Sequence, residues 1–215
     1  VTANDAAGYS QPWIVSGVGR ADAPVVSIHE GGAAYGGTPS DRSVLDAIAE
    51  IKARGLRVAL YPFVMMDVPA DNELSDPYGS AAQAAYPWRG RITCDPAPGQ
   101  PGTADRTATA RTQVEAFLGA AEPGDFSAAE DTIAFAGDPD DWGFRRFVLH
   151  FARLAVAAGG VDAFLVGTEM RGVTTLRDGA GAFPFVEALC DLATEVRAIV
   201  GPETRITYGA DGSGY

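Results

Sequence analysis

Acidic side chains directly follow several apolar segments of the sequence. Glu169 ends "AFLVGTE", Asp67 follows "YPFVMM" and Asp211 follows "RITYGA". If these segments are parallel strands, their carboxyl ends meet at one rim and bring the acids together. Hydrolysis of a glycosidic bond needs two opposed carboxyl groups, one to protonate the leaving oxygen and one to attack or to activate water. Glu169 is therefore a candidate catalytic residue, and Asp67 and Asp211 are candidate substrate-binding residues.

Aromatic and basic residues near these acids could hold a sugar. Tyr61, Trp88 and Tyr208 lie near strand ends or in the long central segment, and flat ring faces suit the apolar faces of sugars. Arg89 could hydrogen-bond hydroxyl groups or clamp a carboxylate, and Arg171 joins the candidate substrate-binding residues. Other interpretations stay open, because packing explains each aromatic equally well.

The strand-end acids have structural interpretations as well. Glu169 could cap the next helix or pair with Arg171, and a single aspartate is commonly a turn former. Metal-assisted hydrolysis by Asp67 and His29 is a weaker alternative. His29 and the adjacent Glu30 would point to opposite faces of a strand, so they could not both bind one metal ion.

Metal and cofactor sites of known pattern are not indicated. Two cysteines, Cys94 and Cys190, and two histidines do not form a disulfide framework or a structural zinc site, so we expect free thiols and no metal. The glycine-rich segments fit neither a dinucleotide fingerprint nor a P-loop, and no G-x-S-x-G elbow is found. We therefore expect no cofactor.

Apolar runs and helical periodicities alternate along the chain, which predicts an α/β fold with a parallel sheet. Helix-capping residues support the pattern, since Ser40 or Asp41 could begin the first helix and Gly55 could end it. The predicted strands cover residues 23–30, 56–67, 162–167 and 205–211, and the predicted helices cover residues 38–55, 142–160 and 183–201.

The chain of 215 residues, with 47% hydrophobic and 20% charged residues, fits one globular domain. Residues 68–140 interrupt the alternation with many turn formers and one predicted helix around "DRTATARTQVEAFLG". We interpret 68–140 as an elaborated βα-loop insertion that forms a wall or lid beside the site.

Charge and hydropathy exclude some classes of partner. The net charge of −12 repels phosphate backbones, so nucleic-acid binding is disfavoured. No apolar stretch approaches the length of a membrane span, and the first residues lack the basic and apolar regions of a signal peptide.

Four segments together resemble a known family: "GGTPSDRSVLDAIAEIKARGLRVALYPFVMMDVP", "AYPWRGRITCDPAPG", "AAGGVDAFLVGTEMRGVTTLR" and "RITYGAD". They are similar to the glycoside-hydrolase-like TIM-barrel domain of the tail-tip, or baseplate hub, protein of gene transfer agents and related phage tails. More distantly, they resemble retaining clan-A glycosidases. The resemblance implies a (β/α)₈ barrel of which this chain, residues 1–215, supplies only about strands two to five.

The resemblance implies that Glu169 is the acid/base residue at the end of strand four. The nucleophile is then expected beyond Tyr215 and the first strand before Val1. Two positions depart from the pattern, since Thr168 replaces the asparagine before the glutamate and "ADG" at 210–212 replaces "ADW". We expect the open edges of such a partial barrel to be covered by the rest of the parent polypeptide or by partners.

The implied function is that of a glycoside-hydrolase-like domain in a phage-like tail or baseplate, made in the bacterial cytoplasm. It would bind or hydrolyse bacterial surface or cell-wall polysaccharide by a retaining two-carboxylate mechanism, beside other tail or baseplate proteins. The alternative is an inert structural or glycan-binding module, because a fold alone does not imply activity.

Overall fold

A computed structural model describes residues 28–29, 32–33, 41–64, 73, 76–84, 88–129 and 132–212. Its centre is a parallel sheet in the order β3 (Ala59–Leu60), β6 (Ala163–Thr168), β7 (Arg205–Gly209). Ala163 is in register with Ala59 on one side and with Arg205 on the other. The predicted α/β class with a parallel sheet is therefore confirmed, and within the described residues the sheet is open.

The predicted helices form close to their expected bounds. They are α1 (Asp41–Ala53), α3 (Phe144–Ala157) and α5 (Pro184–Val200), together with α2 (Ala108–Leu118) in the central segment. Pro184 occupies the first turn of α5, where its missing N–H costs nothing, and Gly201 follows the last turn with φ 80°. Short helices η1 (Arg89–Arg91), η2 (Pro123–Asp125) and α4 (Arg171–Thr174) complete the set.

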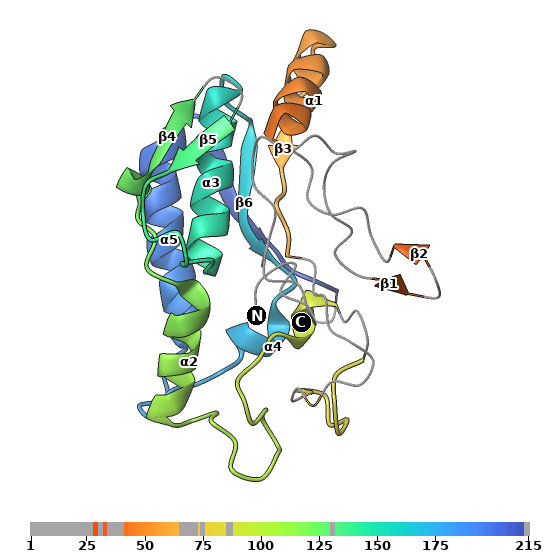
Figure 1. The fold of residues 1–215 in the computed structure, drawn as a ribbon, viewed down its shortest axis with the longest axis vertical. Coiled ribbons are helices and arrows are strands. Elements are labelled where there is room, and N and C mark those ends of the chain that lie inside the picture. The colour runs from red at the N-terminus through yellow and green to blue at the C-terminus, as the bar shows by residue number, and fades with distance from the viewer. Residues whose placement is uncertain are drawn as a thin grey trace.

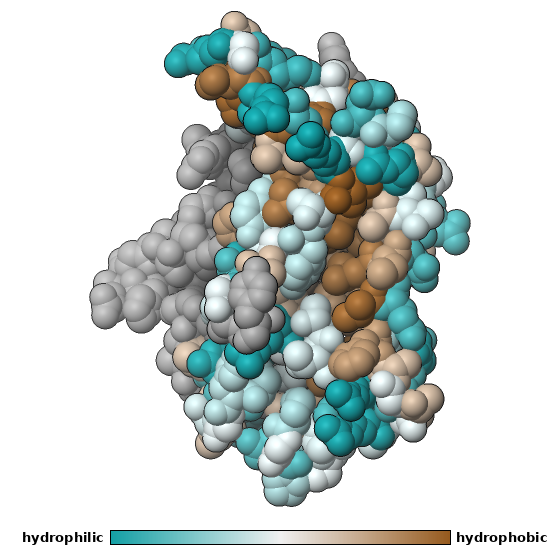
Figure 2. Space-filling model, turned by 180° about the vertical axis from the view of Figure 1, so that it is seen from behind, coloured by the Kyte–Doolittle hydropathy of each residue, from teal (hydrophilic) through white to brown (hydrophobic). Residues whose placement is uncertain are grey.

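Helices α3 and α5 lie side by side along one face of the sheet (Figure 1). Their apolar sides bury Leu149, Leu154, Phe185 and Leu192 completely, against Phe164 of the central strand. The apolar residues whose periodicity predicted these helices are thus the ones that pack on the sheet. Seen from behind, apolar residues form a lengthwise band between hydrophilic patches (Figure 2).

An antiparallel hairpin, β4 (Phe126–Ala129) with β5 (Thr132–Phe135), lies on the outer side of α3 and was not predicted. Its four-residue strands carry little alternation, and only Phe126 and Ile133 are buried. The central segment therefore contains folded elements that cover α3, in addition to loops.

The predicted strand at 23–30 is described only at β1 (Ile28–His29), and the rest of it lies outside the described residues. β1 pairs antiparallel with β2 (Gly32–Ala33) and does not join the parallel sheet in the described part of the chain. Antiparallel strands can follow each other closely in sequence, whereas a parallel partner needs a long crossover.

Asp41 ties α1 to the hairpin and to α3. Its buried carboxylate accepts hydrogen bonds from Thr132 Oγ1 at 2.9 Å and from the backbone N–H of Ile133 at 3.0 Å. The other oxygen, Oδ1, lies 2.7 Å from His150 Nε2. Asp41 begins the helix as predicted, and its side chain also joins three elements.

Lys52, the only lysine of the chain, joins the end of α1 to the end of α3. Its Nζ donates to the carbonyl oxygens of Ala158, Gly159 and Gly160 at 3.2, 2.8 and 3.0 Å. These carbonyls follow the last turn of α3, where the helix dipole favours a cation.

Replacing Lys52 with glutamine is expected to lower the free energy of unfolding by about 1 kcal/mol, because the carbonyls lose a charged donor. Urea denaturation measures the change. Arg54→Gln is the control, since Arg54, one residue past α1, makes an exposed pair with Glu50 of the helix, and its loss should stay below about 0.5 kcal/mol. Equal losses in the two variants would contradict the assigned role of Lys52.

None of the helices in the described part of the chain is long and apolar enough to cross a membrane.

Candidate functional site

Glu169 follows the carboxyl end of β6 in an unusual backbone conformation. Its φ is 51°, in the left-handed region that residues other than glycine rarely adopt. The Glu169 N–H donates to Gly209 O at 2.8 Å, and the Met170 N–H donates to Tyr208 Oη at 2.8 Å. The pairing of β6 with β7 also shifts register between Leu165 and Thr168. Contacts from β7 thus hold the strained backbone at the strand end.

The Glu169 carboxylate contacts two predicted substrate-binding residues. Oε2 accepts from Trp88 Nε1 at 2.8 Å and from Arg89 Nη2 at 2.7 Å. The Arg89 side chain is 13% exposed and that of Glu169 is 29% exposed, so the pair is shielded but reaches the surface. Glu169 therefore pairs with Arg89, and the predicted alternative of a pair with Arg171 is wrong.

Close packing of α4 on η1 brings these residues together. A Cβ on Gly172 would lie 2.6 Å from Gly90 O and 2.5 Å from Ile92 O, so glycine is required at this approach. Gly172 is three residues past Glu169, and Gly90 adjoins Arg89. A side chain at position 172 would therefore separate the carboxylate from its donors.

Two predicted tyrosines contact the same strand end. The Tyr61 hydroxyl is hydrogen-bonded to Thr168 Oγ1, and a Cβ on Gly209 would lie 2.9 Å from that hydroxyl. Burial raises the pKa of Tyr208 above its ordinary value, and the phenol oxygen accepts the Met170 N–H. These tyrosines support the backbone around Glu169.

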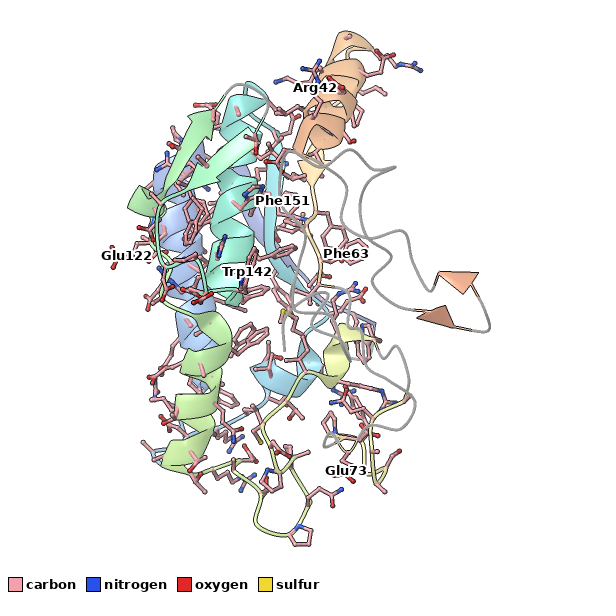
Figure 3. The ribbon with its side chains drawn as sticks, viewed as in Figure 1. Arg42, Phe63, Glu73, Glu122, Trp142 and Phe151 are labelled. Carbon is pink, nitrogen blue, oxygen red and sulfur yellow. The ribbon has the colours of Figure 1, made fainter. Side chains whose placement is uncertain are left out.

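Exposed aromatic rings lie next to the residues that adjoin or contact Glu169. Tyr61, Phe63 and Tyr78 are 39%, 45% and 43% exposed. The Phe63 ring lies 5.9 Å from that of Tyr61 and 4.6 Å from the Arg89 guanidinium carbon. Tyr78 and Trp88 are nearly parallel at 17°, with centroids 6.3 Å apart. Figure 3 shows Phe63 on the side of the sheet away from α3.

Sequence reasoning missed Phe63 and Tyr78. Phe63 lies two residues after Tyr61, the spacing that places two side chains on one face of an extended chain, and this signal could have found it. Tyr78 lies in the turn-rich central segment, where no periodicity indicates its orientation.

The remaining predicted residues lie at different places. Arg171 begins α4 and is exposed, with its guanidinium carbon 6.0 Å from the Tyr78 ring. Asp211 raises the pKa of both Tyr78 and Tyr208 through its charge, after the larger effect of burial. Asp67 lies outside the described residues.

A second ion pair fixes the segment next to the site. Asp76, whose side chain is 1% exposed, is bonded to Arg91 and accepts from the Tyr78 N–H at 3.1 Å. Burial opposes ionisation of Asp76, but its hydrogen bonds and the Arg91 charge outweigh it, so the pKa lies below its ordinary value. The Arg91 guanidinium carbon also lies 4.9 Å from the Tyr78 ring.

The described residues contain no group of three or more His, Cys, Asp or Glu side chains able to hold a metal ion. The two cysteines are free, as predicted, with Cys94 buried and Cys190 exposed.

A family model described as "GTA TIM-barrel-like domain" matches residues 142–215. The predicted resemblance to the TIM-barrel-like domain of gene transfer agents is therefore confirmed over this stretch, which holds α3, β6, α5, β7 and Glu169. No curated protein matches the chain. The two residues that contact the Glu169 carboxylate, Trp88 and Arg89, come before the matched stretch.

Proposed function

We propose that the surface around Glu169 binds bacterial glycan in a gene transfer agent or phage-like tail, with Glu169 as the acid/base residue of a retaining glycosidase. The observation that supports this most is the left-handed backbone of Glu169, which directs the carboxylate onto Trp88 and Arg89. Such a conformation costs about 1–3 kcal/mol and is found most often at functional sites.

The surroundings suit a sugar. Exposed rings of Tyr61, Phe63 and Tyr78 offer apolar faces, while Arg89 and Trp88 offer hydrogen-bond donors around one carboxylate. The phenol of Tyr208 supports the backbone beneath. Rings next to a few fixed polar groups are the usual composition of a small-ligand site.

The parallel sheet fits the proposed barrel. β6 lies between β3 and β7, as strand four lies between strands three and five, and Glu169 follows its carboxyl end. We infer that residues 1–215 are part of one barrel-type domain and that 68–140 are an elaborated insertion. Trp88 and Arg89 of this insertion lie at the proposed mouth, whereas α2 and the hairpin pack on the outer helices. A second carboxyl group about 5–5.5 Å from Glu169 would complete a retaining pair.

An inert module is the second candidate, and one observation favours it. The shielded Arg89–Glu169 pair at 2.7 Å joins η1 to the end of β6, so Glu169 could be kept for structure alone. A baseplate component or glycan-binding module needs no turnover.

Replacing Trp88 with phenylalanine is expected to weaken binding of envelope polysaccharide about tenfold, because part of the ring surface and the indole donor are lost. Calorimetric titration of the full-length parent protein with purified envelope polysaccharides measures this. Trp142→Phe is the matched control, since Trp142 packs against Arg146 beside α3.

The titration also tests the proposal itself. Unchanged affinity in the Trp142→Phe variant and weaker affinity in the Trp88→Phe variant would support a glycan site at Glu169. Lack of saturable binding by the wild-type protein to any envelope polysaccharide would overturn it.

A further inference from the structure

Arg171 differs from the other arginines near the site. Arg89 is paired with Glu169, and Arg91 is paired with the buried Asp76. Arg171 is exposed, and the part of the chain that the structure describes gives its guanidinium no acidic partner. Its position two residues past Glu169, at the start of α4, keeps it close to the proposed glycan surface.

The neighbouring Tyr78 ring is fixed in place. Its hydroxyl donates to Gly90 O at 3.1 Å, and its ring lies parallel to that of Trp88. Arg91 covers the ring at 4.9 Å, while Arg171 is 6.0 Å from the ring centroid, near the limit for attraction between a cation and a ring. The guanidinium donors of Arg171 are therefore available to a ligand that lies on the Tyr78 and Trp88 rings.

The exposed Arg171 guanidinium could bind an anion only through direct contacts. The chain carries a net charge of −12, so its field as a whole repels anions. Asp211 acts electrostatically on Tyr78, as Arg171 does, and lowers the local positive charge. Anion binding here would therefore depend on direct hydrogen bonds from the guanidinium, whose planar fork matches a carboxylate.

We propose that the site takes an acidic sugar, one whose carboxylate accepts hydrogen bonds from Arg171 while its ring lies over Tyr78 and Trp88. This inference rests on the proposed glycan-binding function and adds the class of sugar. A phosphate-bearing sugar offers similar anionic oxygens, and the experiment separates the two.

The test is calorimetric titration of the full-length parent protein with three probes. They are a galacturonic acid oligomer, the same oligomer with its carboxyl groups reduced to alcohols, and a phosphorylated neutral oligomer. We expect the wild-type protein to bind the acidic oligomer about tenfold more tightly than the reduced one, the value of one charge-assisted pair. Arg171→Gln should remove this preference, because it weakens binding of the acidic oligomer about tenfold and that of the reduced oligomer by less than about twofold.

Arg177→Gln is the matched control. Arg177 is also exposed and lies 5.0 Å from an aromatic ring, that of Phe183, in the segment after α4. Its replacement should leave all three affinities unchanged. Arg171→Lys keeps the positive charge but lacks the planar fork of guanidinium donors, so it should retain part of the preference for the acidic oligomer.

The outcomes separate the two proposals. Equal wild-type affinity for the acidic and reduced oligomers, tighter binding of the phosphorylated one, or equal weakening of all probes by Arg171→Gln would each overturn the acidic-sugar inference and leave the glycan site standing. Lack of binding to these probes and to every envelope polysaccharide would overturn the glycan site as well.

Discussion

Replacing Glu169 with glutamine is expected to lower the rate of glycan hydrolysis by at least about 100-fold, because a general acid/base residue contributes roughly 10²–10⁴-fold. Glutamine has the same shape but cannot donate and accept the proton of the leaving oxygen. Release of reducing sugar from bacterial envelope polysaccharide by the full-length parent protein measures the rate. Equal release by the wild-type and variant proteins would remove Glu169 from the mechanism.

Glutamine is the appropriate replacement because its carbonyl oxygen can still accept the hydrogen bonds that Trp88 Nε1 and Arg89 Nη2 donate to Glu169 Oε2. The control is Glu195→Gln. Glu195 pairs with Arg145 at 2.9 Å, and its side chain is 29% exposed, as is that of Glu169. The Glu169→Gln and Glu195→Gln variants thus each lose one carboxylate from a partly exposed ion pair, and they differ only in where that pair lies in the fold.

Glycan affinity separates the two candidate functions. If Glu169 is catalytic, the glutamine variant should bind glycan within about twofold of the wild type, since the lost interaction acts in the transition state. If Glu169 only holds η1 against β6, the wild-type protein should release no sugar, and the variant should lose stability together with affinity.

Sequence periodicity predicted the part of the fold in which local pattern and packing agree. The run at 162–167 is apolar because β6 is the central strand, with Phe164 and Val166 buried. The amphipathic repeats of α3 and α5 place their apolar sides against the same sheet. Placement of Glu169 after a parallel strand followed from this arrangement alone.

Contacts distant in sequence could be predicted only as a set of candidates. Trp88 and Arg89 were predicted to bind substrate, but they contact Glu169 across about 80 residues of chain, and no local pattern encodes that pairing. The left-handed φ of Glu169 was not predictable either, because it depends on bonds to β7. Side-chain type indicated which residues matter, and tertiary packing decided which of them touch.

Asp41 shows the same limit in the core. The sequence favoured Ser40 or Asp41 as the residue that begins and caps α1. The structure also buries Asp41 at 2% exposure, between Thr132 and Ile133 of the hairpin and His150 of α3. Since the hairpin was not predicted from sequence, its bond to α1 could not be predicted.

Replacing Asp41 with alanine is expected to lower the free energy of unfolding by about 3–5 kcal/mol, because three groups lose their partner and each buried group left unsatisfied costs about 1–3 kcal/mol. The Thr132 hydroxyl, the Ile133 N–H and the His150 ring would lose their shared partner while they stay shielded from water. Urea denaturation followed by circular dichroism measures the loss.

Asp46→Ala is the control for this prediction, because Asp46 is on the same helix and makes an exposed pair with Arg42. Its loss should stay within about 0.5 kcal/mol. Asp41→Asn should fall between the two, since the amide keeps one acceptor oxygen and places an N–H₂ group opposite a donor. A loss below about 1 kcal/mol for Asp41→Ala would mean that α1 is held by apolar packing, with the Asp41 bonds as a minor contribution.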